Sequence, residues 1–169
     1  MANLFHPLTV KKIQYETPEC VSVSFEIPFS LKEQFQFREG QYLTLRKQLN
    51  GEEVRRSYSI CCAPHEQELK VAIKKVPGGV FSTFAVEQLK EQDQLEVMPP
   101  AGKFTARLSE KVQPHYLAIA AGSGITPILS IIKHTLHHQP DSHFTLIYGN
   151  QSRGSIIFFE AIEELKNRY

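Results

Sequence analysis

The sequence predicts an antiparallel β-barrel over residues 1–108, a polar linker over 109–114 and the first part of a parallel α/β sheet over 115–169. Before residue 108, short alternating or apolar segments follow one another closely, and closing such strands into a barrel removes exposed edges. After residue 114, continuous apolar runs alternate with segments of helical periodicity. That second pattern is typical of parallel strands joined by right-handed helical crossovers.

The barrel strands are expected at residues 8–13, 21–27, 38–45, 55–60, 69–76 and 94–98. The first two alternate well enough for half-buried strands. A turn is expected at 16–19 and a polar connection at 30–36. Asn50-Gly51 is a strong tight-turn signal just before the fourth strand. Residues 80–89 have the apolar spacing of a short helix.

Two apolar runs and two helical segments make up the α/β part. Residues 116–121 and 144–148 are expected to be strands covered on both faces, as in a parallel sheet. Residues 125–137 and 155–168 have helical periodicity. Two strands rarely make a stable sheet alone, so we expect this chain to be the N-terminal piece of a longer protein; the alternative is a compact protein whose second domain is minimal. The open edge of the first strand is then expected to favour self-association.

Composition excludes several classes of protein. With 41% hydrophobic and 22% charged residues and a net charge of +1, the chain is expected to be a soluble globular protein that binds neither nucleic acid nor membrane. No apolar run approaches the ~20 residues of a membrane span. Cys20, Cys61 and Cys62 are odd in number and form no CxxC motif, which predicts reduced thiols and a cytoplasmic location.

The segment from Arg55 to Ile60 carries the first candidate site. Alternation along a strand puts Arg56, Tyr58 and Ile60 on one face, with Ser57 and Ser59 on the other. A guanidinium suits a diphosphate and an aromatic ring suits a flat heterocycle. The alternative is an edge strand with solvated arginines and a tyrosine in the core.

Two glycine-containing turns precede predicted helices. Glycines allow the backbone to approach a ligand, and a helix N-terminus attracts anions. The first turn leads into its helix through Gly78, Gly79, Val80, Phe81 and Ser82. The second follows a buried strand and contains Gly122, Ser123, Gly124, Thr126 and Pro127, which is the context of a dinucleotide site although proline replaces the last glycine of GxGxxG. Each is alternatively an ordinary turn without a ligand.

Two further groups of residues complete the candidates. Tyr148, Gly149 and Asn150 end the second strand of the α/β part, at the edge where ligands bind in such sheets. The histidines at 134, 137 and 138 invite a metal interpretation, but no acidic ligand stands at a suitable spacing, so no metal is expected.

Taken in order, these motifs resemble the ferredoxin–NADP reductase family, and in particular oxygenase reductase components of the phenylacetyl-CoA epoxidase type. The resemblance implies a Greek-key barrel that binds FAD, with FMN as an alternative, and an α/β domain that binds NADH or NADPH. It assigns Arg56 and Ser57 to the flavin contacts, Tyr58 to stacking on the isoalloxazine and Ser59 to the flavin N5 edge, which makes Tyr58 and Ser59 the catalytic candidates.

The same resemblance implies further contacts and partners. The backbone of Ile73 and Lys74 would contact the ribityl chain or ring of the flavin, and Ser152 and Arg153 would reach the adenosine ribose or its 2′-phosphate. Electrons would pass to an iron–sulfur centre and an oxygenase partner, with the 2Fe–2S cysteines in a C-terminal part beyond this sequence. The alternatives are a reductase that uses flavin as a substrate and a flavin-binding fragment without catalysis.

Overall fold

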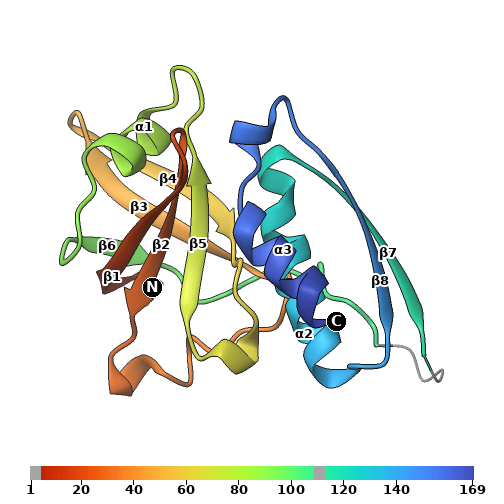
Figure 1. Cartoon of the computed structure of the whole chain (residues 1–169). Helices are drawn as coiled ribbons and strands as arrows, with labels where there is room; N and C mark the ends of the chain where they lie inside the picture. Colours follow the sequence, from red (N-terminus) through yellow and green to blue (C-terminus); the bar gives the residue numbers. More distant parts are fainter. Residues whose placement is uncertain (1–4, 109–112) are drawn as a thin grey trace.

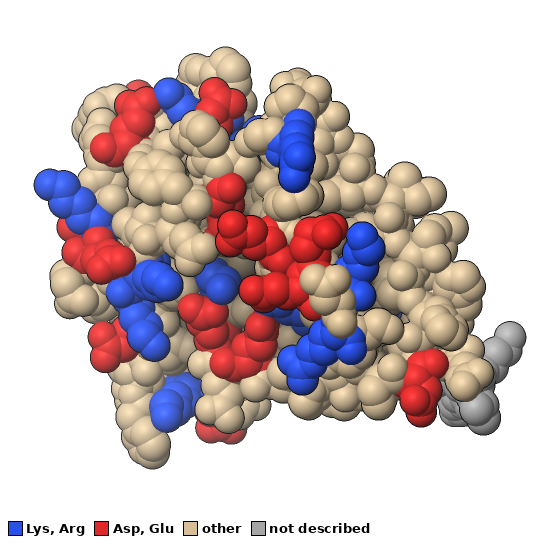
Figure 2. All heavy atoms as spheres, in the orientation of Figure 1, with Lys and Arg blue, Asp and Glu red and all other residues tan. Residues whose placement is uncertain are grey.

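The computed structural model describes residues 5–108 and 113–169 and shows a barrel beside an α/β unit (Figure 1). The predicted linker falls largely at 109–112, outside the described residues. Acidic and basic side chains are intermixed over the face seen in Figure 2, in keeping with the small net charge. None of the described helices is both long and apolar enough to cross a membrane.

The barrel is antiparallel, as predicted. Within the described residues its strands are β1 (His6–Thr17), β2 (Cys20–Glu26), β3 (Tyr42–Leu49), β4 (Glu52–Ser59), β5 (Leu69–Lys74) and β6 (Gln94–Val97). They pair in the order β4-β3-β6-β1-β2-β5. A bridge between Ile60 and Val71 joins the two ends of this order, and so closes the barrel.

Apolar side chains from all six strands fill the barrel, together with α1 (Val80–Glu87). Phe35 belongs to this core, with 2% of its surface exposed. The segment 30–36 was predicted to be only a polar connection. This prediction is corrected, because the segment also places the Phe35 side chain in the barrel core. It begins with the short 3-10 helix η1 (Phe29–Leu31), and one aromatic residue in a polar stretch has no periodicity to reveal it.

The α/β unit contains β7 (His115–Ala121), α2 (Ile125–His138), β8 (His143–Gly149) and α3 (Phe159–Arg168). β7 and β8 pair in parallel, from His115 opposite His143 to Ala121 opposite Gly149. Both helices lie between this sheet and the barrel (Figure 1). The predicted parallel arrangement is confirmed.

The expectation that both faces of these strands are covered is wrong. Leu117 is 65% exposed, Ile119 is 69% exposed and Ile147 is 54% exposed. The reason is that both helices pack on the same face, so among the described residues nothing covers the other. An apolar run is consistent with burial on two faces but cannot supply the second layer.

The last helix begins later than its periodicity predicted. Residues from 155 were expected to be helical, but the chain first forms the 3-10 turn η4 (Arg153–Ser155) and then a left-handed residue, Phe158, with φ 62°. This turn directs Ile157 and Phe158 into the contact between the two parts, where they are 0% and 6% exposed. Tertiary burial therefore outweighs local helix propensity at this point.

The barrel and the α/β unit share a second apolar cluster. The barrel contributes Cys20, Cys61 and Ala72, and the α/β unit contributes chiefly Ile125 and Leu129. Two polar contacts reinforce it: the buried Ser130 hydroxyl donates to the Cys62 carbonyl at 2.7 Å, and Lys133 pairs with Glu66 at 2.8 Å. The relative position of the two parts is thus set by packing as well as by connectivity.

Candidate flavin and nucleotide site

Arg56 and Tyr58 lie on β4 next to α1. Arg56 is exposed and donates from Nη1 to the Arg55 carbonyl at 2.7 Å. None of the ion pairs between described residues involves Arg56. The Tyr58 ring is half-buried and lies 5.8 Å from the Phe81 ring at 37°. Burial raises the pKa of Tyr58 to about 12, against the opposing effect of the nearby Arg56 cation.

The turn before α1 is held by its own side chains. Gly78 has φ 72°, a conformation that favours glycine, and a Cβ on Gly79 would lie 2.6 Å from Ser82 Oγ. The Ser82 hydroxyl accepts from the Val76 N–H at 3.1 Å and donates to the Gly79 carbonyl at 3.3 Å. Ser82 therefore shapes the turn, and Val80, 43% exposed, stands at the open helix start.

Together these elements form a surface suited to an anion and a ring. The contact between Tyr58 and Phe81 brings β4 against the first turn of α1. The first N–H groups of a helix have no partners within the helix and carry partial positive charge. A guanidinium without an ion pair beside such a turn fits a diphosphate, since both supply donors to the same group.

The serines of β4 occupy the other face. The Ser57 hydroxyl lies 3.0 Å from the Thr44 hydroxyl, and Ser59 stands opposite Tyr42 in the strand register. Ser59 is half-buried. A ligand resting on Tyr58 would have to extend past the strand edge to reach Ser59.

Ile73 and Lys74 end β5 and have different environments. The Ile73 side chain is 0% exposed and belongs to the barrel core, so only its backbone is able to contact a ligand. Lys74 is half-buried, and its Nζ lies 3.9 Å from the position a Cβ on Gly122 would take. Among the described residues no carboxylate pairs with Lys74. This ammonium group therefore links the barrel side of the site to the second glycine turn.

The second glycine turn, η3 (Gly122–Gly124), leads directly into α2. Gly122 has φ 50°. Thr126 Oγ1 donates to the Ser123 carbonyl at 3.0 Å, and the Tyr148 hydroxyl donates to the Gly122 carbonyl at 2.9 Å. Hydrogen bonds from α2 and from β8 thus hold the turn in place. Pro127 lies in the first turn of α2, where its missing backbone N–H costs no helical hydrogen bond.

The end of β8 lies beside this turn, but the next residues do not join it. Gly149 pairs with Ala121, and the side-chain amide of Asn150 is buried next to the Tyr148 hydroxyl. Arg153 instead lies over the Phe159 ring at 5.3 Å. No contact between described residues connects Ser152 or Arg153 with the glycine turn.

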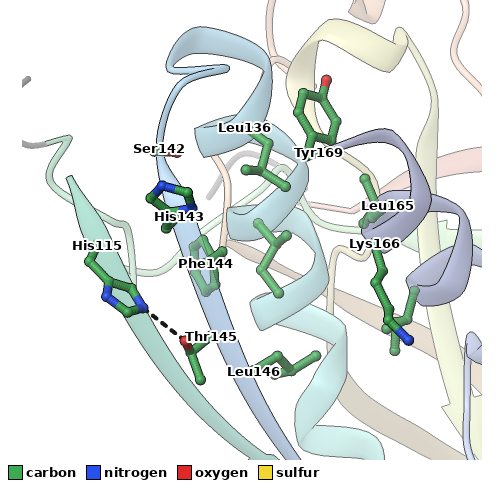
Figure 3. Close-up of a pocket in the computed structure, with 12 residues that line it drawn as sticks. His115, Leu136, Ser142, His143, Phe144, Thr145, Leu146, Leu165, Lys166 and Tyr169 are labelled. Carbon is green, nitrogen blue, oxygen red and sulfur yellow. Dashed lines mark hydrogen bonds between the residues drawn. The ribbon is translucent and has the colours of Figure 1, made fainter. Parts of the chain in front are cut away.

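A separate hollow of about 430 Å³ lies between α2, β8 and α3. Figure 3 shows apolar side chains such as Leu136, Leu146 and Leu165 around it, and a contact of 2.8 Å between His115 Nε2 and Thr145 Oγ1. His115 and His143 begin their strands, so this hollow lies at the opposite end of the sheet from Gly122 and Asn150. It is not part of the candidate site.

Sequence reasoning did not find two contacts that assemble the site. The Tyr58–Phe81 ring contact and the approach of Lys74 to Gly122 both join elements distant in the chain. Nothing in the local pattern of either segment signals them, because the first depends on how α1 packs on β4 and the second on how the α/β unit docks beside β5.

Two family models match the chain. The oxidoreductase FAD-binding domain matches residues 7–106 and the oxidoreductase NAD-binding domain matches residues 118–169. The chain is 48% identical over 165 residues to a subunit of the 1,2-phenylacetyl-CoA epoxidase of Escherichia coli K12, covering 98% of this chain and 46% of that protein. It therefore spans about half the length of this relative.

Solved structures show the same fold. The FAD/NAD-binding domain of nitric oxide dioxygenase from Vibrio cholerae superposes with a TM-score of 0.82 at 26% identity, covering 95% of this chain and 69% of that one. Phthalate dioxygenase reductase, described as a modular structure for electron transfer from pyridine nucleotides to [2Fe-2S], gives a TM-score of 0.75 at 26% identity, covering 97% and 50%. The chain belongs to the family of flavin-dependent oxidoreductases in which an FAD-binding barrel precedes an NAD-binding domain.

Proposed function

We propose that this chain forms the flavin and nucleotide half of a reductase that takes a hydride from NADH or NADPH and passes electrons through FAD to an iron–sulfur centre and an oxygenase. The relation to the phenylacetyl-CoA epoxidase component supports a place in the degradation of aromatic acids such as phenylacetate. The observation that carries the proposal is the position of Lys74, at the end of the barrel strand β5, beside the nucleotide turn: its Nζ lies 3.9 Å from where a Cβ on Gly122 would be.

Each residue has a definite role in this proposal. Arg56 and the first turn of α1 bind the flavin diphosphate, since both supply hydrogen-bond donors. Tyr58 offers its ring to the isoalloxazine, and its position against Phe81 fixes the plane of that ring. When bound, FAD supplies two-electron chemistry with nicotinamide and one-electron chemistry with the acceptor.

The nucleotide is held by the other half of the site. The turn from Gly122 to Gly124 and the start of α2 bind its pyrophosphate, and Thr126 and Tyr148 keep the turn in shape through their hydrogen bonds. Ser59 is proposed to contact the N5 edge of the flavin where the ring extends past the edge of β4. The role of the protein is to hold the two rings in reacting orientation and exclude water.

The proposed division is a flavin-binding barrel over 1–108, a linker over 109–114 and part of a nucleotide-binding domain over 115–169. The cofactors are proposed to bind between the barrel and the nucleotide-binding part. Three free, fully buried cysteines support a reducing compartment such as the cytoplasm. Self-association is proposed through the outer side of β7, where Leu117 and Ile119 are exposed and a strand edge is unpaired within the described chain.

The test is an absorbance spectrum of the purified chain before and after NADH and NADPH under anaerobic conditions. Copurifying FAD that is bleached by one of the nucleotides is the expected result. Flavin that is bound only weakly and turns over as a substrate would instead indicate a flavin reductase. Tightly bound flavin that neither nucleotide reduces would contradict the assignment of the second glycine turn.

A further inference from the structure

Four histidines meet where the end of α2 contacts the barrel. His65 lies in the 3-10 turn η2 (Pro64–Glu66), and its ring stacks on that of His137 with centroids 3.9 Å apart and planes at 11°. The centroid of the His138 ring lies 5.1 Å from that of the His137 ring and 4.2 Å from that of the His134 ring. These four residues, His65, His134, His137 and His138, are called the imidazole cluster below.

We propose that the imidazole cluster is a proton-sensitive contact that holds the α/β unit against the barrel when its rings are neutral and weakens this contact on acidification. The stacked pair is the part that spans the two units. A charge on one ring disfavours a charge on the other at 3.9 Å, although solvent screens this repulsion because both side chains are exposed.

The buried nitrogen of one ring also favours the neutral form. His138 Nδ1 donates to the His134 carbonyl at 2.9 Å, a bond that the neutral and the charged ring form equally, so the preference comes from His134. His134 Nδ1 is buried without a hydrogen-bond partner among the described residues. A neutral ring protonated at Nε2 leaves Nδ1 as a bare acceptor, whereas a charged ring would bury an unpaired N–H, which is the more costly arrangement.

The surrounding charges do not offset this preference. Glu66, next to His65, is already committed, because Oε1 binds Lys133 at 2.8 Å and Oε2 accepts from the Ala63 N–H at 2.7 Å. Glu39 faces His134 Nε2 at 3.6 Å, which favours the charged ring. Cations oppose it.

The cations and acids around the cluster come from every element packed against it. They are Arg38 and Glu39 before β3, Glu66 in η2, Arg107 before the linker, Lys133 in α2, and Glu164 and Arg168 in α3. This set holds four cations and three acids, so the surroundings do not favour adding protons.

The pKa directions agree with the geometry. Burial and the neighbouring histidines lower the pKa of His65 below 6.5, and burial lowers that of His134 despite Glu39. A histidine whose pKa is lower in the folded state stabilises that state above the unfolded pKa, and this contribution is lost as the pH falls below about 6.5. The contact is therefore expected to weaken as the pH falls below about 6.5.

The experiment compares the wild-type chain with a His65→Asn/His137→Asn double variant and with His143→Asn, an exposed histidine at the start of β8. Urea unfolding is measured at pH 7.5, 6.5 and 5.5. The wild-type and His143→Asn folding constants should fall about fivefold further on acidification than that of the double variant. Amide exchange over residues 128–132, corrected for intrinsic rates, should accelerate at pH 5.5 in the wild type but not in the double variant.

NMR of the imidazole C2–H signals supplies a second readout. The signals of His65 and His134 should titrate below pH 6.5, the ordinary pKa of histidine. Parallel stability profiles for wild type and double variant would overturn the proposal, as would His65 and His134 signals that titrate at or above pH 6.5. If the double variant does not fold, His65→Phe, which keeps an aromatic stack but removes a titrating ring, takes its place with the same expected outcome.

Discussion

Arg56→Ala is expected to weaken flavin binding by removing a charge-assisted hydrogen bond to phosphate. Arg56 is exposed and has no ion pair among the described residues, so its guanidinium can bind a ligand without breaking an ion pair; its Nη1 donates only to the Arg55 carbonyl at 2.7 Å. Such a bond is worth about 1.5–3 kcal/mol. That corresponds to a Kd for FAD about 10- to 150-fold higher.

The assay is a fluorescence titration of the apoprotein with FAD, FMN and riboflavin. Riboflavin has no phosphate, so its affinity should be the same in the variant and the wild type, whereas FAD and FMN should both lose affinity. The unfolding free energy should change by less than about 0.5 kcal/mol, because an exposed side chain is removed.

Arg55→Ala is the matched control. Arg55 is adjacent and equally basic, but its Nε donates to Glu53 at 2.7 Å and its guanidinium lies 5.1 Å from the Phe5 ring centroid. Its replacement should leave the affinity for all three flavins unchanged. The reasoning would be refuted by an equal loss for riboflavin and FAD in Arg56→Ala, since that pattern indicates altered packing, or by unchanged FAD affinity.

Three further predictions concern the nucleotide turn, the domain contact and the tyrosine. Gly122→Val should abolish measurable pyridine-nucleotide binding in calorimetry while FAD binding persists, because φ 50° is a left-handed conformation that a branched side chain rarely adopts; normal nucleotide affinity would contradict it. Ser130→Ala should lower the unfolding free energy in urea by about 1–3 kcal/mol by leaving the Cys62 carbonyl unpaired; no loss would show that this bond contributes nothing. Because burial raises the pKa of Tyr58 to about 12, its stabilising contribution should be lost as the pH rises from 10 through 12. An ultraviolet titration should show the same number of tyrosines ionising near pH 10 in the wild type and in Tyr58→Phe; one more tyrosine ionising near pH 10 in the wild type would be contrary to the burial of Tyr58.

The order of elements was readable from the sequence because local patterns determine it. Alternation marked the barrel strands, Asn50-Gly51 marked the turn before β4, and a change to apolar runs marked the α/β part. The two glycine turns were identified by their position before helices, since an anion site of this kind is built from contiguous residues. Element ends were less certain, as the start of α3 at Phe159 instead of residue 155 shows.

Tertiary structure alone decided how these parts meet. The placement of α2 and α3 on one face left Leu117 and Ile119 exposed, although their run of apolar residues looked fully buried. The docking of the α/β unit on the barrel brought Lys74 to Gly122 and His65 to His137. Hydrophobic periodicity reports which side of an element is apolar, but not which partner covers it, because burial is non-directional and depends on surfaces far apart in the chain.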